Sequence, residues 1–334
     1  MELRTIDYHT AGEPFRIVVG GAPDIPGASV RERRERARAD AEIDAVRKLL
    51  CHEPRGHADM YGCFLVPPDD DAAAIGSLFW HKDGFSTACG HGTIALGAWL
   101  VESGRVEAIA DGETPLAIDV PSGRVLARVR RERGSLSGVT FRNVPAYVLA
   151  RGLELSLEGG RRVAVDIAFG GAIYASLPAA ALGLSVEPAR IADLIAAGRA
   201  VKAALAGSEA ARHPSDERLS GIYGTIFYEE RGESPVRQRN VTVFADGQVD
   251  RSPCGSGTSA RAAVLHADGL LALGAALVHE SIVGTEFRAH VTDELTAEGR
   301  PAVITEVSGA AYRTGEHRFL LDPRDPLRDG FVLR

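Results

Sequence analysis

Hydrophobic and polar residues alternate along several short stretches of the chain, and this alternation predicts strands. The alternating stretches 116–120 and 125–129, joined at Ser122-Gly123, predict a β-hairpin. Further strands are expected at 3–7, 17–19, 61–66, 75–80, 163–167, 173–176, 222–228, 241–244, 302–307 and 317–321. Apolar residues at helical spacing predict one helix over 29–50 and another over about 188–205.

One short motif occurs twice, and each copy leads into an apolar run at helical spacing. The pattern Cys-Gly-x-Gly-Thr-x-Ala starts at Cys89 and again at Cys254. The two runs end at Ser103-Gly104 and at Asp268-Gly269, where a helix C-cap is expected. The cysteines lie 165 positions apart (254 − 89), about half of the 334-residue chain. This spacing indicates a duplicated domain in which both copies of the motif have the same role.

The repeated order of strands, a helix that begins with glycine, and more strands predicts two similar α/β domains. Pro145-Ala146 is the expected boundary between the two halves. Clefts between domains are favoured places for small ligands, so a site is expected between the halves.

The composition changes this picture little. Hydrophobic residues make up 45% and charged residues 25%, an ordinary globular balance. The net charge of −7 argues against nucleic acid as a partner, and no apolar run is long enough to span a membrane. The N-terminal residues have no signal-peptide core, so a cytoplasmic protein is expected. The four cysteines have no metal-type spacing, and Cys51 and Cys63, outside any repeat, are interpreted as structural.

The position of each motif gives its cysteine a chemical role. A thiol just before a helix faces the positive end of the helix dipole, which lowers its pKa and makes it a usable base. The first N–H groups of the helix can hold an anion such as a carboxylate. Two such helix ends that face each other would hold a carboxylate with a sulfur on either side. The alternative is that both cysteines are small buried apolar residues.

The glycines allow a second alternative, a dinucleotide site. Gly90-x-Gly92-x-x-Ala95 and its repeat match the loose dinucleotide fingerprint. That fingerprint needs a tight turn straight after a buried strand, but the residues before each motif are polar, and the candidate strands end about eight residues too early. Nucleotide binding is therefore disfavoured.

The motifs resemble those of the proline racemase superfamily, which includes proline racemases, 4-hydroxyproline 2-epimerases and trans-3-hydroxy-L-proline dehydratases. The resemblance runs over essentially the whole chain. It rests on His9-Thr10-Ala11-Gly12-Glu13-Pro14, Glu53-Pro54-Arg55-Gly56-His57, Asp59-Met60-Tyr61-Gly62, Cys89-Gly90-His91-Gly92, Asp166-Ile167-Ala168-Phe169-Gly170-Gly171, Ile222-Tyr223-Gly224, Asp250-Arg251-Ser252-Pro253-Cys254-Gly255-Ser256-Gly257-Thr258 and Asp325-Pro326-Leu327-Arg328-Asp329-Gly330-Phe331.

The resemblance implies a mixed α/β (α+β) fold of two domains of the diaminopimelate-epimerase type, each a sheet wrapped around a central helix. The expected N-terminal domain is 1–145 with 315–334, and the expected C-terminal domain is 146–314. It also implies a homodimer, and chemistry without pyridoxal phosphate, metal or other cofactor. The family's two catalytic bases fall on Cys89 and Cys254. Its substrate-contacting positions fall on Gly90, His91, Asp250, Gly255 and Ser256.

Inversion of an amino-acid α-carbon needs one group that removes a proton and an opposite group that supplies one. Two cysteines meet this need when one is a thiolate and the other a thiol, in a coupled titration. In the dehydratase branch, a threonine usually replaces the second cysteine. Cys254 therefore favours a racemase or epimerase of proline or hydroxyproline, although His213-Pro214-Ser215-Asp216 and Ile222-Tyr223-Gly224-Thr225 resemble dehydratases at least as closely. A lyase on trans-3-hydroxy-L-proline and a non-catalytic amino-acid binder are the alternatives.

Overall fold

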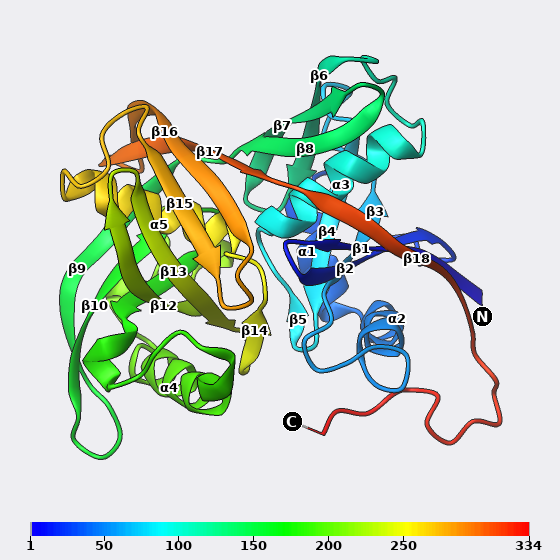
Figure 1. The fold of residues 1–334 in the computed structure, drawn as a ribbon. Helices are drawn as coiled ribbons and strands as arrows, with labels where there is room; N and C mark the ends of the chain where they lie inside the picture. Colours follow the sequence, from blue (N-terminus) through cyan, green and yellow to red (C-terminus); the bar gives the residue numbers. More distant parts are fainter. Residues whose placement is uncertain (1, 334) are drawn as a thin grey trace. The chain divides into compact units, whose positions relative to one another are not determined.

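The computed structural model describes residues 2–333, which divide into two compact units (Figure 1). Unit 1 takes the chain up to Thr140 and resumes at Ala310, and unit 2 is Phe141–Gly309. Both boundaries fall five residues before the expected ones, at 140 against 145 and at 309 against 314. The first shift arises because Asn143 already belongs to unit 2: its backbone N–H donates to Thr305 O, and its side-chain amide donates to Gly170 O.

Unit 1 is built of strands and three helices within the described residues. Its strands are β1 (Glu2–Thr10), β2 (Glu13–Gly20), β3 (Gly62–Val66), β4 (Ile75–His81), β5 (Gly84–Phe85), β6 (Gly112–Val120), β7 (Gly123–Glu132) and β18 (Ala311–Leu320). Its helices are α1 (Val30–Ala39), α2 (Ala41–Cys51) and α3 (Gly90–Glu102). β8 (Ser135–Arg142) carries the chain into unit 2.

Unit 2 repeats this plan. Its strands are β9 (Ala146–Ser156), β10 (Arg162–Phe169), β11 (Ile173–Pro178), β12 (Ile222–Glu233), β13 (Val236–Phe244), β14 (Gln248–Asp250), β15 (Ala276–Ser281), β16 (Glu286–Ala297) and β17 (Arg300–Gly309). Its α-helices are α4 (Ile191–Ala204) and α5 (Gly255–Ala267). Short 3-10 helices lie at Ala179–Leu182, Pro188–Arg190, Glu209–Ala211 and Glu217–Leu219.

The strand pairings of the two units follow the same succession. In unit 1, β18–β1 and β1–β2 are antiparallel, β2–β3 parallel, β3–β4 and β4–β5 antiparallel, β4–β6 parallel and β6–β7 antiparallel. In unit 2, β9–β10 and β10–β11 are antiparallel, β11–β12 parallel, β12–β13 and β13–β14 antiparallel, β13–β15 parallel and β15–β16 antiparallel. The repeated motif thus belongs to a repeated fold, in which β9 takes the place that the chain-terminal β18 takes in unit 1.

Each repeated motif opens a helix that is buried on every side. In α3 the residues Gly90–Val101 are all buried, and in α5 the residues Gly255–Leu265 are all buried. The sheet of unit 2 closes around α5, because β16–β17 and β17–β9 pair antiparallel and complete the ring. α5 contacts β9, β10, β11, β16 and β17. A helix whose side chains are mostly small or apolar on every side is suited to such a central position.

The expected single helix over 29–50 is wrong, because the chain forms two helices there. Asp40 has extended backbone angles (φ −103°, ψ 113°) and ends α1. Its carboxylate accepts hydrogen bonds from the backbone N–H groups of Glu42 and Ile43, so it is the N-cap of α2. The apolar periodicity runs through this break, and it gives no sign of the change in direction.

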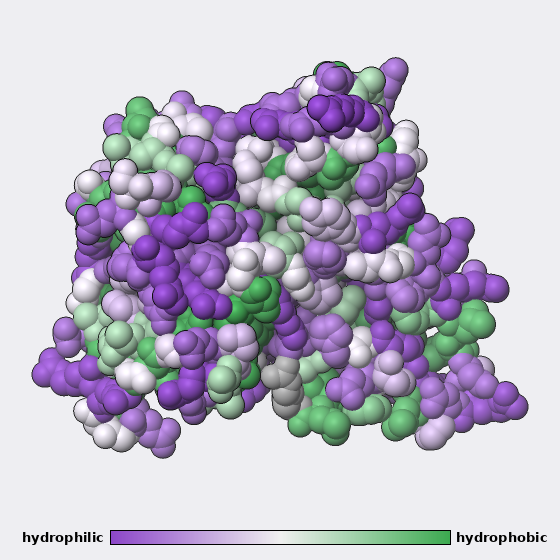
Figure 2. Space-filling model, in the orientation of Figure 1, coloured by the Kyte–Doolittle hydropathy of each residue, from purple (hydrophilic) through white to green (hydrophobic). Residues whose placement is uncertain are grey.

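The mixed α/β fold class predicted from the sequence is confirmed, while several strands escaped the sequence pattern. β16 is an example: only its first half is buried, and Asp293 and Glu294 interrupt the alternation. On the face drawn in Figure 2, hydrophobic residues occur in separate small groups among hydrophilic ones. Within residues 2–333, the helices are too short and too polar for any of them to cross a membrane.

Candidate active site

Cys89 lies at the N-terminus of the central helix of unit 1. It has an extended backbone (φ −155°, ψ 105°) and is the N-cap residue of α3. Its Sγ accepts a hydrogen bond from the backbone N–H of Gly92 at 3.2 Å. Such an N–H group has no partner within the helix, and a sulfur that accepts from it gains most when it is negatively charged.

His91 lies directly beside this sulfur. Both ring nitrogens are 3.5 Å from Cys89 Sγ. The imidazole is 3% exposed and makes edge contacts with the rings of Phe15 and Tyr61, at centroid distances of 5.7 and 4.8 Å. Burial lowers the pKa of His91 to about 3. At neutral pH the imidazole is therefore uncharged, and it offers the sulfur a hydrogen bond and not an ion pair.

Cys254 has a different backbone at the start of the central helix of unit 2. Its φ is +63° and its ψ is 96°, a region that non-glycine residues rarely adopt. The strained angle is held from both sides: the backbone N–H of Cys254 donates to Ser252 Oγ at 3.1 Å, and Cys254 O accepts from the N–H of Thr258 at 2.7 Å. Strain of this kind is concentrated at functional positions.

Asp250 ends β14 and is bound to the same serine. Its Oδ1 accepts from the backbone N–H of Ser252 at 2.8 Å and from the Ser252 hydroxyl at 2.7 Å. Burial raises the pKa of Asp250 to about 6, and the two hydrogen bonds from Ser252 oppose that rise. Ser252 thus connects the carboxylate to the backbone of Cys254, a role that its place in the sequence motif did not reveal.

The expectation that the helix end lowers the pKa of both thiols is wrong for Cys254. Burial raises the pKa of the Cys254 thiol well above its ordinary value, and the negative charge of Asp250 raises it further. A side-chain hydrogen bond with Thr242, the backbone N–H of Gly257 and the hydroxyl of Tyr174 act in the opposite direction but do not outweigh these effects. Desolvation of a thiolate is more costly here than one helix end can offset.

The second glycine of each motif leaves room for the sulfur. A Cβ on Gly92 would lie 2.8 Å from Cys89 Sγ, and a Cβ on Gly257 would lie 2.9 Å from Cys254 Sγ. Neither distance is tolerable for a carbon and a sulfur that do not bond. The Cys-Gly-x-Gly pattern therefore fits the thiol into the first turn of the helix in both units.

The other two cysteines have no such surroundings. Cys51 and Cys63 are 0% exposed, against 6% for Cys89 and 5% for Cys254. Burial raises the pKa of both Cys51 and Cys63 to about 12. Among residues 2–333, no group of three or more His, Cys, Asp or Glu side chains could hold a metal ion.

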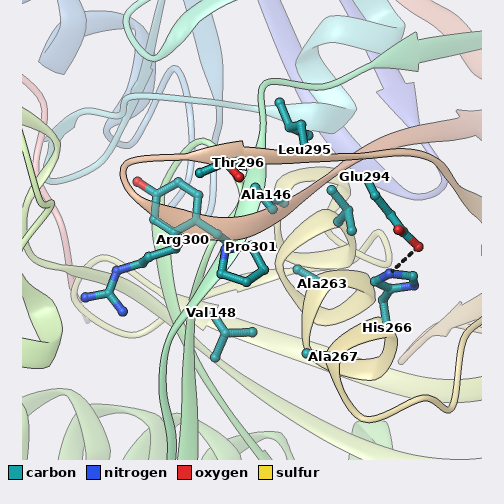
Figure 3. Close-up of a pocket in the computed structure, with 13 residues that line it drawn as sticks. Ala146, Val148, Ala263, His266, Ala267, Glu294, Leu295, Thr296, Arg300 and Pro301 are labelled. Atoms are coloured by element: carbon teal, nitrogen blue, oxygen red, sulfur yellow. Dashed lines mark ion pairs between the residues drawn. The ribbon is translucent and has the colours of Figure 1, made fainter.

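A pocket of about 390 Å³ in unit 2 lies at the other end of α5 (Figure 3). α5 contributes Ala263, His266 and Ala267 to it, and His266 Nε2 forms an ion pair with Glu294 at 3.1 Å. His266 is about 16 Å along the helix from Gly255, at 1.5 Å per residue. This pocket is therefore separate from the motif that contains Cys254.

The structure distributes the expected site residues over the two units. Cys89, Gly90 and His91 lie at the start of α3, and Asp250, Cys254, Gly255 and Ser256 lie at the start of α5 or just before it. Sequence reasoning missed Tyr174, whose hydroxyl is 2.6 Å from Ser256 Oγ. It lies in β11, which is buried from Ile173 to Leu177, so nothing in the pattern distinguishes it from a core residue.

The surroundings of the four thiols predict an order of reactivity. We expect iodoacetamide near neutral pH to modify Cys89 fastest, Cys254 more slowly, and Cys51 and Cys63 slowest, because the last two are fully buried whereas Cys89 and Cys254 keep 6% and 5% of their surface exposed. Mass spectrometry of peptides over a time course measures the order. Equal labelling of all four cysteines would contradict this description of the site.

A second prediction tests the space beside the sulfur. Gly257→Ala places a methyl group 2.9 Å from Cys254 Sγ and 3.1 Å from the flexible end of Ile226, so the sulfur must move. A misplaced reacting group costs about 100-fold in rate, so we expect a loss of that order in any activity that uses Cys254. Gly232→Ala is the control, since its nearest contacts are at 3.7 Å. Unchanged alkylation of Cys254 and unchanged activity in Gly257→Ala would show that the sulfur does not need this space.

Comparison with known proteins identifies the family to which this chain belongs. Residues 5–332 match the family described as Proline racemase. A Bacillus cereus protein named trans-3-hydroxy-L-proline dehydratase is 42% identical over 329 residues, which cover 98% of this chain and 97% of that protein. A Burkholderia multivorans protein named 3-hydroxyproline 2-epimerase is 42% identical over 332 residues, which cover 99% and 98%. The crystal structure of a hydroxyproline epimerase from Agrobacterium vitis with bound trans-4-hydroxy-L-proline has a TM-score of 0.91 and 31% identity, covering 99% of this chain and 96% of that one. The resemblance seen in the sequence is thus confirmed, and the chain belongs to the proline racemase family of enzymes.

Proposed function

We propose that this protein inverts the α-carbon of a hydroxyproline or proline, with Cys89 and Cys254 as the two bases and without a cofactor. One observation carries the proposal: the two thiols occupy the same place in two copies of one fold. Each precedes the first turn of a fully buried helix, and each is followed by a glycine that leaves room for its sulfur. The relative named 3-hydroxyproline 2-epimerase and the epimerase that binds trans-4-hydroxy-L-proline support the substrate class.

The two thiols differ in a way that suits a two-base reaction. Cys89 Sγ accepts the Gly92 N–H, whereas burial and the charge of Asp250 disfavour a thiolate at Cys254. In the proposal, Cys89 is the thiolate in the resting enzyme and Cys254 the thiol. Cys89 removes the α-proton from one face and Cys254 donates its proton to the other, which leaves the pair in the reverse state. The pair returns to the resting state when the reaction runs backwards or when the protons exchange with water.

The charged groups of the substrate have complementary partners. Asp250 is the acidic member of the site, so we assign it to the ring ammonium of the substrate. Occupation by that cation would also favour the ionised carboxylate of Asp250, whose pKa burial raises to about 6. The first-turn N–H groups at Gly90 and His91 and at Gly255 and Ser256 are assigned to the carboxylate and to the charge that develops on it in the carbanion.

Dehydration of trans-3-hydroxy-L-proline is the second candidate function, because a 42% identical relative is named for it. In that reaction one base removes the α-proton, the C3–O bond breaks, and the hydroxyl leaves with a proton as water. The resulting enamine tautomerises to a cyclic imine. Elimination needs a base on one face only, so the presence of a second thiol at Cys254 favours inversion.

Proton NMR in D2O tests the function directly. Proline, 3-hydroxyproline and 4-hydroxyproline are each incubated with the enzyme. Deuterium at the α-carbon together with formation of the epimer supports the isomerase, and we expect this with at least one hydroxyproline. Formation of the cyclic imine or its keto acid would identify the dehydratase instead. Neither exchange nor product with any of the three would contradict both functions and favour a binding protein.

Replacement of Cys254 tests the two-base assignment. Cys254→Ser keeps a similar shape at φ +63°, but a serine hydroxyl is far too weak an acid and base for this role. We expect inversion to fall about 100-fold or more, while α-proton exchange on the Cys89 face continues. Cys254→Thr should behave alike and, with trans-3-hydroxy-L-proline, should release some imine.

The control for this experiment is Cys51→Ser, because Cys51 lies outside both motifs and its Sγ–H donates to Met60 O, as a serine hydroxyl can. Inversion at the wild-type rate in Cys254→Ser would show that Cys254 is not a base.

A further inference from the structure

The hydroxyl of Tyr174 links the two functional side chains of the second motif. Tyr174 is the second residue of β11 and is 1% exposed. Its Oη is 2.6 Å from Ser256 Oγ and 3.8 Å from Cys254 Sγ, within hydrogen-bonding range for a sulfur. The sulfur of Cys254 therefore has a protein hydroxyl beside it, in addition to the backbone at the start of α5.

The three groups can satisfy their hydrogen bonds in both protonation states of the thiol. When Cys254 is a thiol, its S–H donates to Tyr174 Oη and the tyrosine O–H donates to Ser256 Oγ. When Cys254 is a thiolate, the tyrosine O–H turns to the sulfur and the Ser256 O–H donates to Tyr174 Oη. Only hydroxyl hydrogens rotate between these states, so no heavy atom has to move.

Packing holds the tyrosine ring in this place. The ring makes a T-shaped contact with Tyr223 at a centroid distance of 5.7 Å, and Tyr223 stacks on Phe244 at 5.6 Å. Tyr174 also belongs to a buried apolar cluster with Ile226 and Cys254 itself. Burial raises the pKa of Tyr174 well above its ordinary value, so the hydroxyl keeps its proton and acts as a neutral donor.

The equivalent position in unit 1 holds a phenylalanine. Tyr174 comes three residues after Gly171 (φ 98°), at the start of β11, and Phe15 comes three residues after Gly12 (φ 96°), at the start of β2. β2 and β11 have the same place in the two sheets. Phe15 has no hydroxyl, and in unit 1 the neighbour of the sulfur is the imidazole of His91. The two halves of the duplication therefore differ at this position.

From this geometry we infer that Tyr174 is a positioning residue for Cys254, whose hydroxyl allows that thiol to gain and lose its proton without rearrangement of the site. The inference rests on the proposed two-base function. Asp250, on β14, is the charged group that disfavours the thiolate at Cys254, and the hydroxyl of Tyr174, together with Thr242 and the backbone N–H of Gly257, partly offsets it. Tyr174 thus keeps the buried cysteine able to act as a base as well as an acid.

The first test measures the thiol itself and needs no substrate. Tyr174→Phe removes one oxygen and keeps the ring and its packing. We expect the alkylation rate of Cys254 at a fixed pH to fall about tenfold, because a hydrogen bond to a charged group is lost. The rate of Cys89 in the same sample is the internal reference and should not change. Tyr147→Phe is the matched control in unit 2, because it also removes a buried hydroxyl, one that bonds to His213 Nε2 at 2.9 Å.

The second test measures catalysis by NMR in D2O. In Tyr174→Phe, we expect inversion to fall about tenfold while α-proton exchange on the Cys89 face stays at the wild-type rate. A purely structural role would lower exchange and inversion together, and that result would overturn the inference. Unchanged alkylation of Cys254, or an equal fall in Tyr147→Phe, would overturn it as well. If the wild-type enzyme neither exchanges nor inverts any of the three substrates, the proposed function fails, while the alkylation result still decides whether Tyr174 controls this thiol.

Discussion

Burial of a helix on all sides is the constraint on which the rest of this structure depends. The strands pack around α3 and α5, so most residues of both helices are small or apolar, and polar residues among them such as Arg261 and Thr258 are buried as well. The backbone polar groups inside each helix satisfy one another, but the first-turn N–H groups cannot. The N-terminus of each helix is therefore a place at the centre of the unit where an acceptor is needed. A cysteine sulfur meets that need at Cys89, and such N–H groups can also bind an anion.

The same constraint explains why two glycines follow each cysteine, at the first and at the third position after it. The sulfur lies against the first turn, where a methyl group on Gly92 or Gly257 would come within 3 Å of it. At Cys254 the backbone also adopts a positive φ, which Ser252 and Thr258 hold through hydrogen bonds. The motif thus provides both the space and the hydrogen bonds that a thiol needs in a crowded interior. Both halves of the duplication have this need, and both share the motif.

Features that depend on local pattern could be predicted from the sequence, and features that depend on neighbours in space could not. The two motifs, the hairpin at Ser122-Gly123 and the helix ends at Ser103 and Asp268 follow from spacing and turn residues, and the structure has them all. The break at Asp40 does not follow, because capping by an aspartate competes with a helical periodicity that continues through it. The role of Tyr174 was invisible for a similar reason: its partners are 80 and 82 positions away. The pKa of Cys254 is raised, and not lowered as expected, because a sequence motif specifies the helix end but not the burial around it.

Duplication alone would give two equal thiols, and two equal thiols are poorly suited to a reaction that needs one acid and one base. The two sulfurs occupy equivalent places at the start of a central helix, but the backbone angles of Cys89 and Cys254 differ, and so do the side chains around them. In unit 1 a neutral imidazole and a phenylalanine ring lie at the start of α3, and in unit 2 a carboxylate, a serine and a tyrosine hydroxyl lie at the start of α5. Asp250 and burial together favour the thiol at Cys254, and the hydroxyl of Tyr174 limits that preference. The proposed reaction requires that the two thiols differ only moderately in acidity. A thiol that could never ionise would allow the enzyme to act on only one enantiomer of the substrate. In the proposed reversible reaction, each sulfur must accept a proton as well as donate one.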